Sequence, residues 1–469
     1  MILCSGGKVA KMPDMKFWGH LALLIGGIFL PTNAVAQEAA VVSEQSGGLD
    51  VLLGTKALWE MTAEQVEGQF TEMGFRWLSE TSKVHGMIRP KVPPEAKSEP
   101  VVGQPKKKKM RIFNGLLEAE QVDLEFKEAK LAAVTISIWN KGDAKKLSEK
   151  EFFDRVEKLK TVVTSKLGAR MQELGKNGAN AAQAIIVRWE TDQTEAVMEH
   201  CSDGKKGAEF HGEFIRLRFS PRQKRPLGSD GNSNVAKVNL ADLAKNVKRT
   251  ETNDVYVAGV PMVDQGEKGY CALATSERIF RYFGIQCDQH DMAKASESGK
   301  GGTKPAEFEE ALHKLQAKFK VRVKDIITWG EKDYTKFTEA YNREAKKVGA
   351  RQCPPTYFIT TFTGLNPVAL REARAKGGEF EKFRKAVMDS TRKGIPLLWG
   401  LELGIYPESG QKGNQTAGGH MRLIIGFNET DEQVIFSDSW GAGHELKRMK
   451  MRDAFSVTSG LYAIEPMAR

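Results

Sequence analysis

The chain has 469 residues, a length that corresponds to two or three domains. Hydrophobic residues make up 41% and charged residues 28%, which excludes a disordered chain and an integral membrane protein. The formal net charge is +10, but the 70 basic and 60 acidic residues are mixed along the chain. A nucleic-acid-binding protein typically gathers its basic residues on one face, so we expect no nucleic acid partner.

The N-terminus has the layout of a secretory signal peptide. After Met15, a lysine is followed by the apolar run Leu21–Leu30 and by Ala34-Val35-Ala36, a small-x-small cleavage site before Gln37. The run is too short to span a bilayer comfortably, and an uncleaved anchor is the alternative interpretation. We expect residues 1–36 to be removed and the mature protein to be exported, to the periplasm or outside the cell, without a stable membrane anchor.

Four cysteines follow this cleavage site: Cys201, Cys271, Cys287 and Cys353. Exported proteins usually pair their cysteines, but the wide and uneven spacing here forms no compact disulfide framework. If one cysteine stays free for chemistry, at most one bridge can form, and Cys287 with Cys353 is one possible pair.

Residues 37–48 are a polar lead-in, and residues 49–220 are predicted to form a separate α+β domain. Capping-box patterns at Thr62-x-x-Gln65 and Ser148-x-x-Glu151 open two helices, the first directed toward Trp77 and the second stopped by Gly168. Alternating apolar residues predict strands. These predicted strands lie at 122–126, 134–138, 184–189 and 215–219.

His200, Cys201 and His211 form a cluster of possible metal ligands in this half of the chain. A fourth ligand and a regular spacing are missing, so we interpret them as ordinary loop residues and expect no metal or other cofactor. Residues 221–254 are predicted to be a linker, because their first part is rich in Gly, Ser, Asn and Pro.

The second domain, residues 255–469, begins with the stretch "QGEKGYC" at 265–271. Apolar residues recur at helical spacing after Cys271, and Gly284 ends the pattern, so a helix is predicted to begin at Cys271. A thiol at a helix N-terminus loses its proton more easily, and the thiolate is the nucleophile. The amide of Gln265 could donate to a developing oxyanion. A buried structural cysteine is the alternative.

The far end of this domain carries a histidine and an aspartate. His420 opens an apolar strand that runs to Phe427, a turn follows, and Asp438 ends the next strand. A hairpin of this kind sets the two side chains beside each other. A carboxylate that orients a histidine, with a cysteine to activate, is the arrangement of covalent catalysis.

Helices and one strand are predicted between the two motif regions, followed by a glycine-rich loop. The helices are expected at 306–319, 334–347 and 379–392, and the strand at 395–403. The loop at 404–419 directly precedes His420, so it is expected to border the substrate cleft.

The sequence resembles the papain-like cysteine peptidases on three motifs. "DQGEKGYC" has the Gln-Gly and Cys of that family, "GGH" before an apolar strand has its histidine motif, and "SDSWG" is similar to its Asn-Ser-Trp-Gly motif. The resemblance covers residues 255–465. Asp438 stands where papain has asparagine, and Ala272 where papain has tryptophan, which is closer to the bacterial Cys-His-Asp branch that resembles the leader-peptide peptidases of peptide exporters.

The resemblance implies a two-lobed domain, with a helical lobe behind Cys271 and an antiparallel sheet lobe carrying His420. It implies a hydrolase of peptides or proteins in which Cys271 is the nucleophile, His420 the base and Asp438 its orienter. Gln265 would stabilise the oxyanion, and Trp440 would shield the histidine from water. His290, interpreted as part of an exposed turn, and His444 are the competing histidines.

Two other function classes stay open. An acyl-transferring enzyme of the transglutaminase type would use the same triad, and a non-catalytic peptide-binding module could share the fold. For residues 49–220, an inhibitory pro-segment is ranked slightly ahead of a docking domain, because papain-like enzymes commonly carry a pro-segment between signal peptide and catalytic domain. The sequence does not give the oligomeric state.

Overall fold

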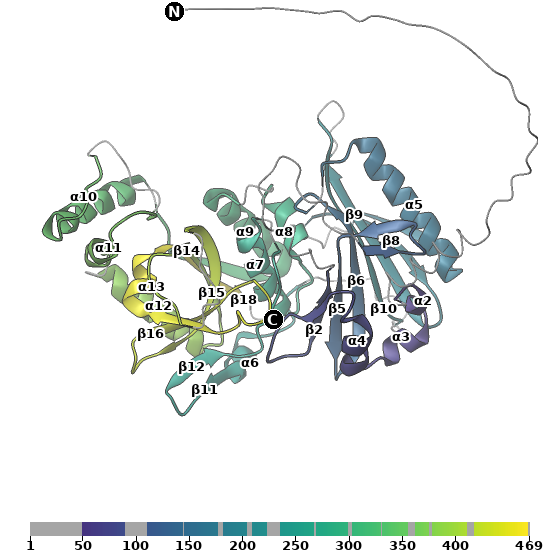
Figure 1. The fold of residues 1–469 in the computed structure, drawn as a ribbon, viewed down its shortest axis with the longest axis horizontal. Coiled ribbons are helices and arrows are strands. Elements are labelled where there is room, and N and C mark those ends of the chain that lie inside the picture. Colours follow the sequence, from purple (N-terminus) through teal and green to yellow (C-terminus); the bar gives the residue numbers. More distant parts are fainter. Residues whose placement is uncertain are drawn as a thin grey trace, which may run out of the picture. The chain divides into compact units, whose positions relative to one another are not determined.

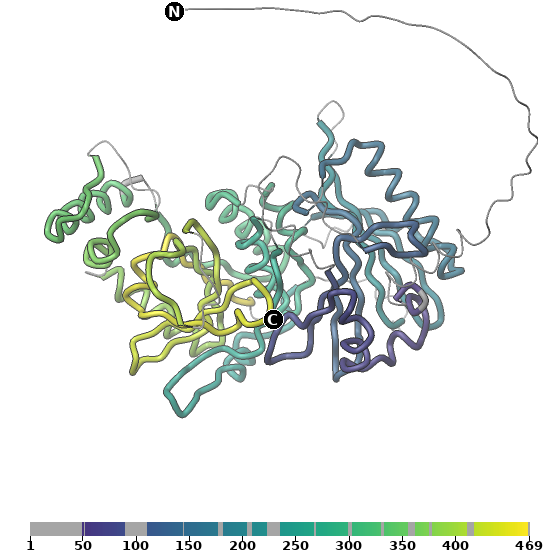
Figure 2. Tube along the Cα trace, viewed as in Figure 1, coloured from purple at the N-terminus to yellow at the C-terminus, as the bar shows by residue number. Residues whose placement is uncertain are grey.

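The computed structural model describes residues 49–89, 110–143, 145–176, 182–203, 209–222, 235–266, 269–298, 303–329, 331–354, 362–374, 378–409 and 417–467. All of these residues fall within one compact unit (Figures 1 and 2). The predicted signal peptide and lead-in lie outside the described residues, as do residues 223–234 of the predicted linker and residues 410–416 of the glycine-rich loop.

The N-terminal part of the described chain forms an eight-stranded sheet in which all neighbouring strands are antiparallel. Its order is β1 (Phe75–Trp77), β2 (His85–Ile88), β5 (Gln121–Lys127), β6 (Lys130–Asn140), β10 (His211–Pro221), β9 (Thr194–Asp203), β8 (Ile185–Glu190) and β7 (Met171–Lys176). A separate two-stranded sheet pairs β3 (Met110–Ile112) with β4 (Leu117–Ala119). The four strands predicted from alternation correspond to β5, β6, β8 and β10.

The helix α5 (Glu149–Leu167) covers one face of this sheet (Figure 1). It begins at the capping box of Ser148 and Glu151 and ends at Gly168, whose φ of 59° is easily adopted by a residue without a Cβ atom. Its buried side chains are Phe152, Val156, Leu159 and Val163, the face predicted from helical periodicity. These side chains join the apolar residues of the sheet in the N-terminal core.

Three short helices precede the sheet: α2 (Leu49–Leu52), α3 (Lys56–Glu60) and α4 (Ala63–Phe70). The capping box predicted at Thr62 and Gln65 is present at the start of α4. The helix is shorter than expected, because Gly74 turns the chain with a φ of 91° and Trp77 belongs to β1.

The C-terminal part contains a second antiparallel sheet with its own core. The main path runs β11 (Val247–Arg249), β12 (Asp254–Val257), β15 (Gly418–Asn428), β14 (Leu397–Leu403), β18 (Thr458–Pro466) and β13 (Val321–Ile327). On the other edge of β15, β16 (Gln433–Ser437) pairs with β15 and β17 (Lys447–Lys450) pairs with β16. The strand β15 is therefore paired on both edges.

The helices of this part are α6 (Leu240–Leu243), η2 (Ala244–Asn246), α7 (Cys271–Tyr282), α8 (Gln289–Ala295), α9 (Pro305–Phe319), α10 (Glu331–Lys347), α11 (Pro367–Arg374), α12 (Gly378–Arg392) and α13 (Met451–Ser456). The predicted helices after Cys271 and at 306–319, 334–347 and 379–392 are confirmed as α7, α9, α10 and α12. Both parts contain helices and antiparallel sheets, which agrees with the predicted α+β class.

Two local expectations are corrected by the structure. His200 and Cys201 lie in the strand β9 and are buried, so they are not loop residues; the alternation of their segment is obscured by charged and polar residues. His290 lies on α8 and is largely buried, so it does not belong to an exposed turn. In addition, Ala236 and Leu243 pack in the C-terminal core, so the described end of the predicted linker belongs to that core.

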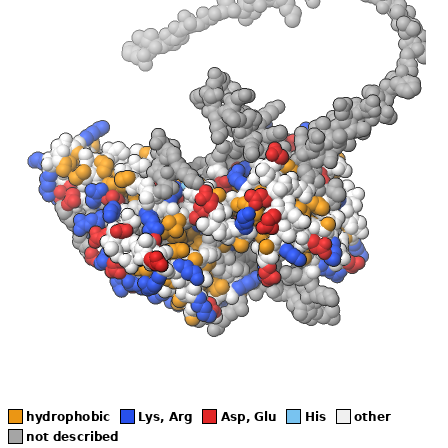
Figure 3. All heavy atoms as spheres, turned by 60° about the horizontal axis from the view of Figure 1, so that its bottom comes forward, with side chains coloured by type: hydrophobic (Ala, Val, Ile, Leu, Met, Phe, Trp, Pro, Cys, Tyr) orange, Lys and Arg blue, Asp and Glu red, His pale blue; other side chains and the backbone are white. Residues whose placement is uncertain are grey.

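The surface agrees with the mixed charge of the sequence: on the face drawn in Figure 3, acidic and basic side chains are interspersed. Among the residues that the structure describes, no helix combines the length and the apolar character needed to cross a membrane. Cys201, Cys271, Cys287 and Cys353 are all free, so the possible Cys287–Cys353 bridge is not formed.

Candidate active site

Cys271 is the first residue of α7, as the sequence predicts. Most of α7 is buried. The hydroxyl of Thr275, one turn after Cys271, holds the first turn of the helix against the sheet. The Thr275 hydroxyl lies 2.6 Å from the carbonyl oxygen of Cys271, 3.2 Å from that of Met421 in β15, and 3.2 Å from the Ser439 hydroxyl. The nucleophile candidate is therefore tied to the strand that carries His420 and to the segment that follows Asp438.

His420 and Asp438 are brought together by the hairpin of β15 and β16, in which Leu423 is paired with Ser437. His420 Nε2 lies 2.8 Å from Asp438 Oδ1, and the two side chains are only 5% and 0% exposed. The Trp440 ring stacks on the His420 ring, with 4.7 Å between centroids and 27° between planes. This is the arrangement expected of an orienting carboxylate and a shielding indole.

The thiol of Cys271 and the ring of His420 interact and shift each other's pKa. Burial opposes a thiolate, but the hydrogen bond and the charge of His420 outweigh it and hold the pKa of Cys271 below its ordinary value. Burial likewise disfavours an imidazolium, but the hydrogen bonds to Asp438 and Cys271 raise the pKa of His420. Both shifts favour the thiolate–imidazolium pair. Since Nε2 faces Asp438, Nδ1 is the ring nitrogen left for the thiol.

Gln265 lies in a loop held against the segment after Asp438. Its backbone N–H donates to the Ser439 carbonyl at 2.9 Å, and the preceding Asp264 pairs with Trp440 as an isolated β-bridge. Gln265 is 9% exposed, and its Oε1 has no hydrogen-bond partner among the described residues. The loop thus reaches the group of Cys271, His420 and Asp438, so the structure gathers all four predicted site residues.

Two buried cations form ion pairs with the carboxylate of Asp438. Neither ion pair was predicted from the sequence. Arg422 Nε lies 2.8 Å from Oδ1 and Lys447 Nζ 2.8 Å from Oδ2, and these side chains are 0% and 1% exposed. Arg422 Nη1 also lies 2.7 Å from Glu408 Oε1. Burial alone would raise the pKa of Asp438, but the charge of Arg422, His420 and Lys447 holds it well below its usual range.

Arg422 also joins Asp438 to a second carboxylate, Glu408, so that four charged side chains meet beside His420. Asp438 and Glu408 carry two negative charges that Arg422 and Lys447 balance, so the aspartate acts on His420 largely through its hydrogen bond. The signal available in the sequence was Arg422 itself, a charged residue inside the apolar run of β15.

Arg278, on the buried side of α7, is a third residue that the sequence did not reveal. Its Nε donates to the Pro261 carbonyl at 2.8 Å, and its Nη1 to the Asp438 carbonyl at 2.9 Å. The third nitrogen, Nη2, donates to the Ser437 hydroxyl at 2.7 Å. Burial lowers the pKa of Arg278 to about 10, which leaves it charged at neutral pH. One guanidinium thus joins the helix, the entry to the Gln265 loop and the end of β16.

The other candidates for the base and the nucleophile lie elsewhere or have other neighbours. The His290 ring contacts Tyr270, with 6.0 Å between centroids, and the His444 ring meets the edge of Trp440 at 5.4 Å. Cys201 donates to the Ala182 carbonyl at 3.3 Å, and burial raises its pKa to about 12. Within the described ranges, no group of three or more His, Cys, Asp or Glu residues could hold a metal ion.

In a comparison with protein families, the Peptidase_C39 like family matches residues 257–461. The matched range contains Gln265, Cys271, His420 and Asp438 and supports a cysteine peptidase, a hydrolase of the papain-like or C39 type. It does not include the N-terminal sheet. A search of curated proteins finds no match to the chain.

Proposed function

We propose that the protein is an exported thiol peptidase that hydrolyses peptide bonds through an acyl-enzyme on Cys271. The observation that carries this proposal is the convergence of Cys271, His420 and Asp438, with both pKa shifts of the Cys271–His420 pair favouring the ionised form. The family match over residues 257–461 supports the same reaction class.

In the first half of the reaction, the Cys271 thiolate attacks the carbonyl carbon of the scissile peptide bond. A C–S bond forms, and the carbonyl electrons move to the oxygen. The Gln265 side chain and the backbone N–H of Cys271 stabilise this oxyanion, because the N–H groups of the first helical turn have no partner within the helix. His420 then gives its proton to the leaving nitrogen, and the C–N bond breaks.

In the second half, water releases the acyl group. Neutral His420 takes a proton from the water as it attacks the thioester carbon, and the thiolate leaves when the tetrahedral intermediate collapses. The hydrogen bond that His420 Nε2 donates to Asp438 keeps the ring in one orientation through both halves, and the stacked Trp440 keeps water from this bond. No cofactor takes part in this proposal.

Export and the domain division are part of the proposal. We propose that residues 1–36 are a signal peptide and that residues 49–220 form one domain and the C-terminal part a second, in which the predicted 255–469 is extended back to the core residue Ala236; the two hydrophobic cores support this division. Asp438 in place of the papain asparagine and Ala272 in place of its tryptophan support a position near the bacterial Cys-His-Asp branch. Intact mass measurement of the exported protein tests cleavage: the proposal expects a chain that begins at Gln37.

The experiment that tests the reaction compares wild type with Cys271→Ala on an unstructured peptide. Wild type should hydrolyse it and should react with iodoacetamide at Cys271, and Cys271→Ala should do neither. Incorporation of an added amine in place of hydrolysis would replace this proposal with acyl transfer. A wild-type protein that binds peptides with an unreactive Cys271 would replace it with a binding module.

A further inference from the structure

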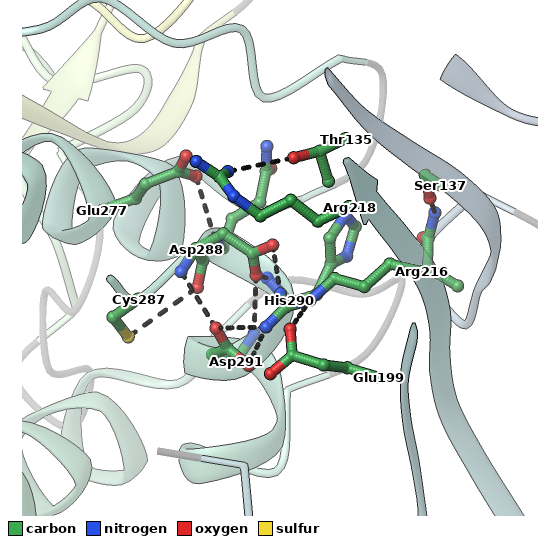
Figure 4. Close-up of polar contacts among 12 residues, drawn as sticks. Thr135, Ser137, Glu199, Arg216, Arg218, Glu277, Cys287, Asp288, His290 and Asp291 are labelled. Carbon is green, nitrogen blue, oxygen red and sulfur yellow. Dashed lines mark hydrogen bonds and ion pairs between the residues drawn. The ribbon is translucent and has the colours of Figure 1, made fainter. Parts of the chain in front are cut away.

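The N-terminal sheet has a second face, and this face is charged. Along β10, Ile215, Leu217 and Phe219 belong to the apolar core, whereas Arg216 and Arg218 alternate with them and point to the opposite side. Such a face is ordinarily solvated. Here the Arg216 side chain is only 11% exposed, because α8 lies over it (Figure 4).

Arg216 anchors the N-terminal sheet to α8. Its Nη2 lies 3.1 Å from both carboxylate oxygens of Asp291, its Nη1 contacts Asp288, and its Nε lies 2.7 Å from Glu199 on the neighbouring strand (Figure 4). Asp288 also caps α8, accepting from the backbone N–H groups of His290 and Asp291. The ion pairs therefore hold the start of α8 against the sheet.

The start of α8 contacts the Gln265 loop. Gln289, the first residue of α8, donates from its side chain to the Asp264 carbonyl at 3.4 Å, and its backbone N–H donates to Glu277 of α7 at 2.9 Å. The anchored helix end thus lies between the N-terminal sheet, the helix of Cys271 and the residue that precedes Gln265.

A second contact from the N-terminal sheet reaches the same loop directly. Arg76 in β1 places Nη2 2.7 Å from Asp264 Oδ2, and the other carboxylate oxygen accepts the Gly266 N–H at 2.7 Å. Gly266 has a φ of 69° and lies under the Arg89 guanidinium, where a Cβ atom would come within 2.8 Å of Nη1. Leu78, Met87 and Met262 form a small apolar cluster beside these contacts.

One carboxylate oxygen of Asp264 therefore binds Arg76, and the other accepts the hydrogen bond from the turn that follows Gln265. On the opposite side, the Gln265 backbone is bonded to Ser439. The glutamine loop is held between the β1–β2 hairpin and the segment that follows Asp438.

We infer that Arg76, acting through Asp264, is a positioning residue for Gln265, and that the N-terminal sheet is a working part of the peptidase. This inference rests on the proposed function, in which Gln265 stabilises the oxyanion. In this inference the N-terminal sheet supports activity, because its contacts fix the oxyanion loop. This role differs from that of the inhibitory pro-segment expected from the order of the chain.

The test uses the full chain with Arg76→Gln, Asp264→Asn and a matched control, Lys83→Gln. The amide oxygen introduced by Asp264→Asn would still accept the Gly266 N–H, but the ion pair to Arg76 would be lost. Lys83 also forms an exposed ion pair from the N-terminal part, but its partner is Glu67, in the same part. The quantities measured are kcat and KM on an unstructured peptide and the rate of Cys271 alkylation by iodoacetamide.

Arg76→Gln and Asp264→Asn should each lower kcat on the order of tenfold, a part of the 10²–10³-fold that one oxyanion donor contributes. KM and the alkylation rate should stay close to wild type, because the thiolate depends on His420. In a Gln265→Ala background, Arg76→Gln should have no further effect on kcat. The control should match wild type throughout.

A wild-type kcat in Arg76→Gln would overturn the inference and leave the proposed function standing. If Arg76→Gln lowered kcat as much in the Gln265→Ala background as in wild type, the inference would also be overturned, because Arg76 would then act through another group. Failure of the wild-type protein to hydrolyse any peptide would overturn the proposed function, and with it this role of Arg76.

Discussion

Lys447 lies 2.8 Å from Oδ2 of Asp438, the carboxylate oxygen that the His420 ring does not use. The lysine therefore neutralises the orienting carboxylate without competing for its hydrogen bond to the histidine. Its Nζ also lies 4.9 Å from the centre of the Trp440 ring, so the same ammonium group contacts the indole that stacks on His420.

Removing the charge of Lys447 should extend activity to higher pH. In Lys447→Gln the amide can still donate to Asp438, but the carboxylate holds the imidazolium more strongly and the already raised pKa of His420 rises further. Activity needs protonated His420 and is lost as pH rises through this pKa. The alkaline limb of the kcat/KM profile should therefore move upward relative to wild type.

The control for Lys447 is Lys450→Gln in the same strand, where an exposed lysine donates to the Asp431 carbonyl. Its pH profile should coincide with that of wild type. An alkaline limb of Lys447→Gln that stays in place or moves to lower pH would show that Lys447 does not tune His420.

The four free cysteines should differ sharply in their contribution. Cys271→Ser should abolish hydrolysis, whereas Cys201→Ser, Cys287→Ala and Cys353→Ser should retain most of it. Burial keeps the pKa of Cys201 and Cys287 above the ordinary value, so these thiols stay protonated, and the pKa of Cys353 is raised for the same reason. Initial rates on one peptide measure this, and a loss at Cys287 equal to that at Cys271 would refute the assignment of the nucleophile.

Gln265→Ala should lower kcat on the order of 10²–10³-fold, the usual loss for one oxyanion donor. KM should change little, because this interaction strengthens in the transition state. Steady-state kinetics measure both constants. A near-normal kcat would mean that Gln265 is a loop residue without a role in the reaction.

Thr275→Val should disturb the placement of Cys271. The valine keeps the shape of the side chain but leaves the Met421 carbonyl and the Ser439 hydroxyl without this partner, which costs about 1–3 kcal/mol of the free energy of unfolding. Denaturant unfolding and kcat should both show the loss. Thr161→Val is the matched control, because its hydroxyl is bonded to the carbonyl one turn earlier in the exposed part of α5. Equal stability of the two variants would contradict this role of Thr275.

Local signals in the sequence predicted the elements that carry the candidate site. The capping boxes at Thr62 and Ser148 and the stop at Gly168 have purely local causes, and they appear in the structure. The helix at Cys271 and the hairpin that joins His420 to Asp438 follow from apolar periodicity and a turn, which also need no information about distant residues.

Contacts between distant segments could not be predicted in this way. Arg216 and Arg422 each lie in a strand between two apolar neighbours, and only the folded chain shows which carboxylates surround them. The helix α8 was missed because its sequence is short and polar, and its cap is closed by two aspartates, Asp288 and Asp291, where the usual pattern has Glu or Gln at the second position.

The most direct test of the central claim is the mass of the protein caught during turnover of an activated peptide ester. Rapid acid quench should give wild-type protein heavier by one acyl group, and peptide mapping should place that group on Cys271. Cys271→Ala should gain no mass, and His420→Ala should acylate far more slowly. An acyl group on another residue, or turnover without any covalent adduct under conditions that trap thioesters, would contradict the account.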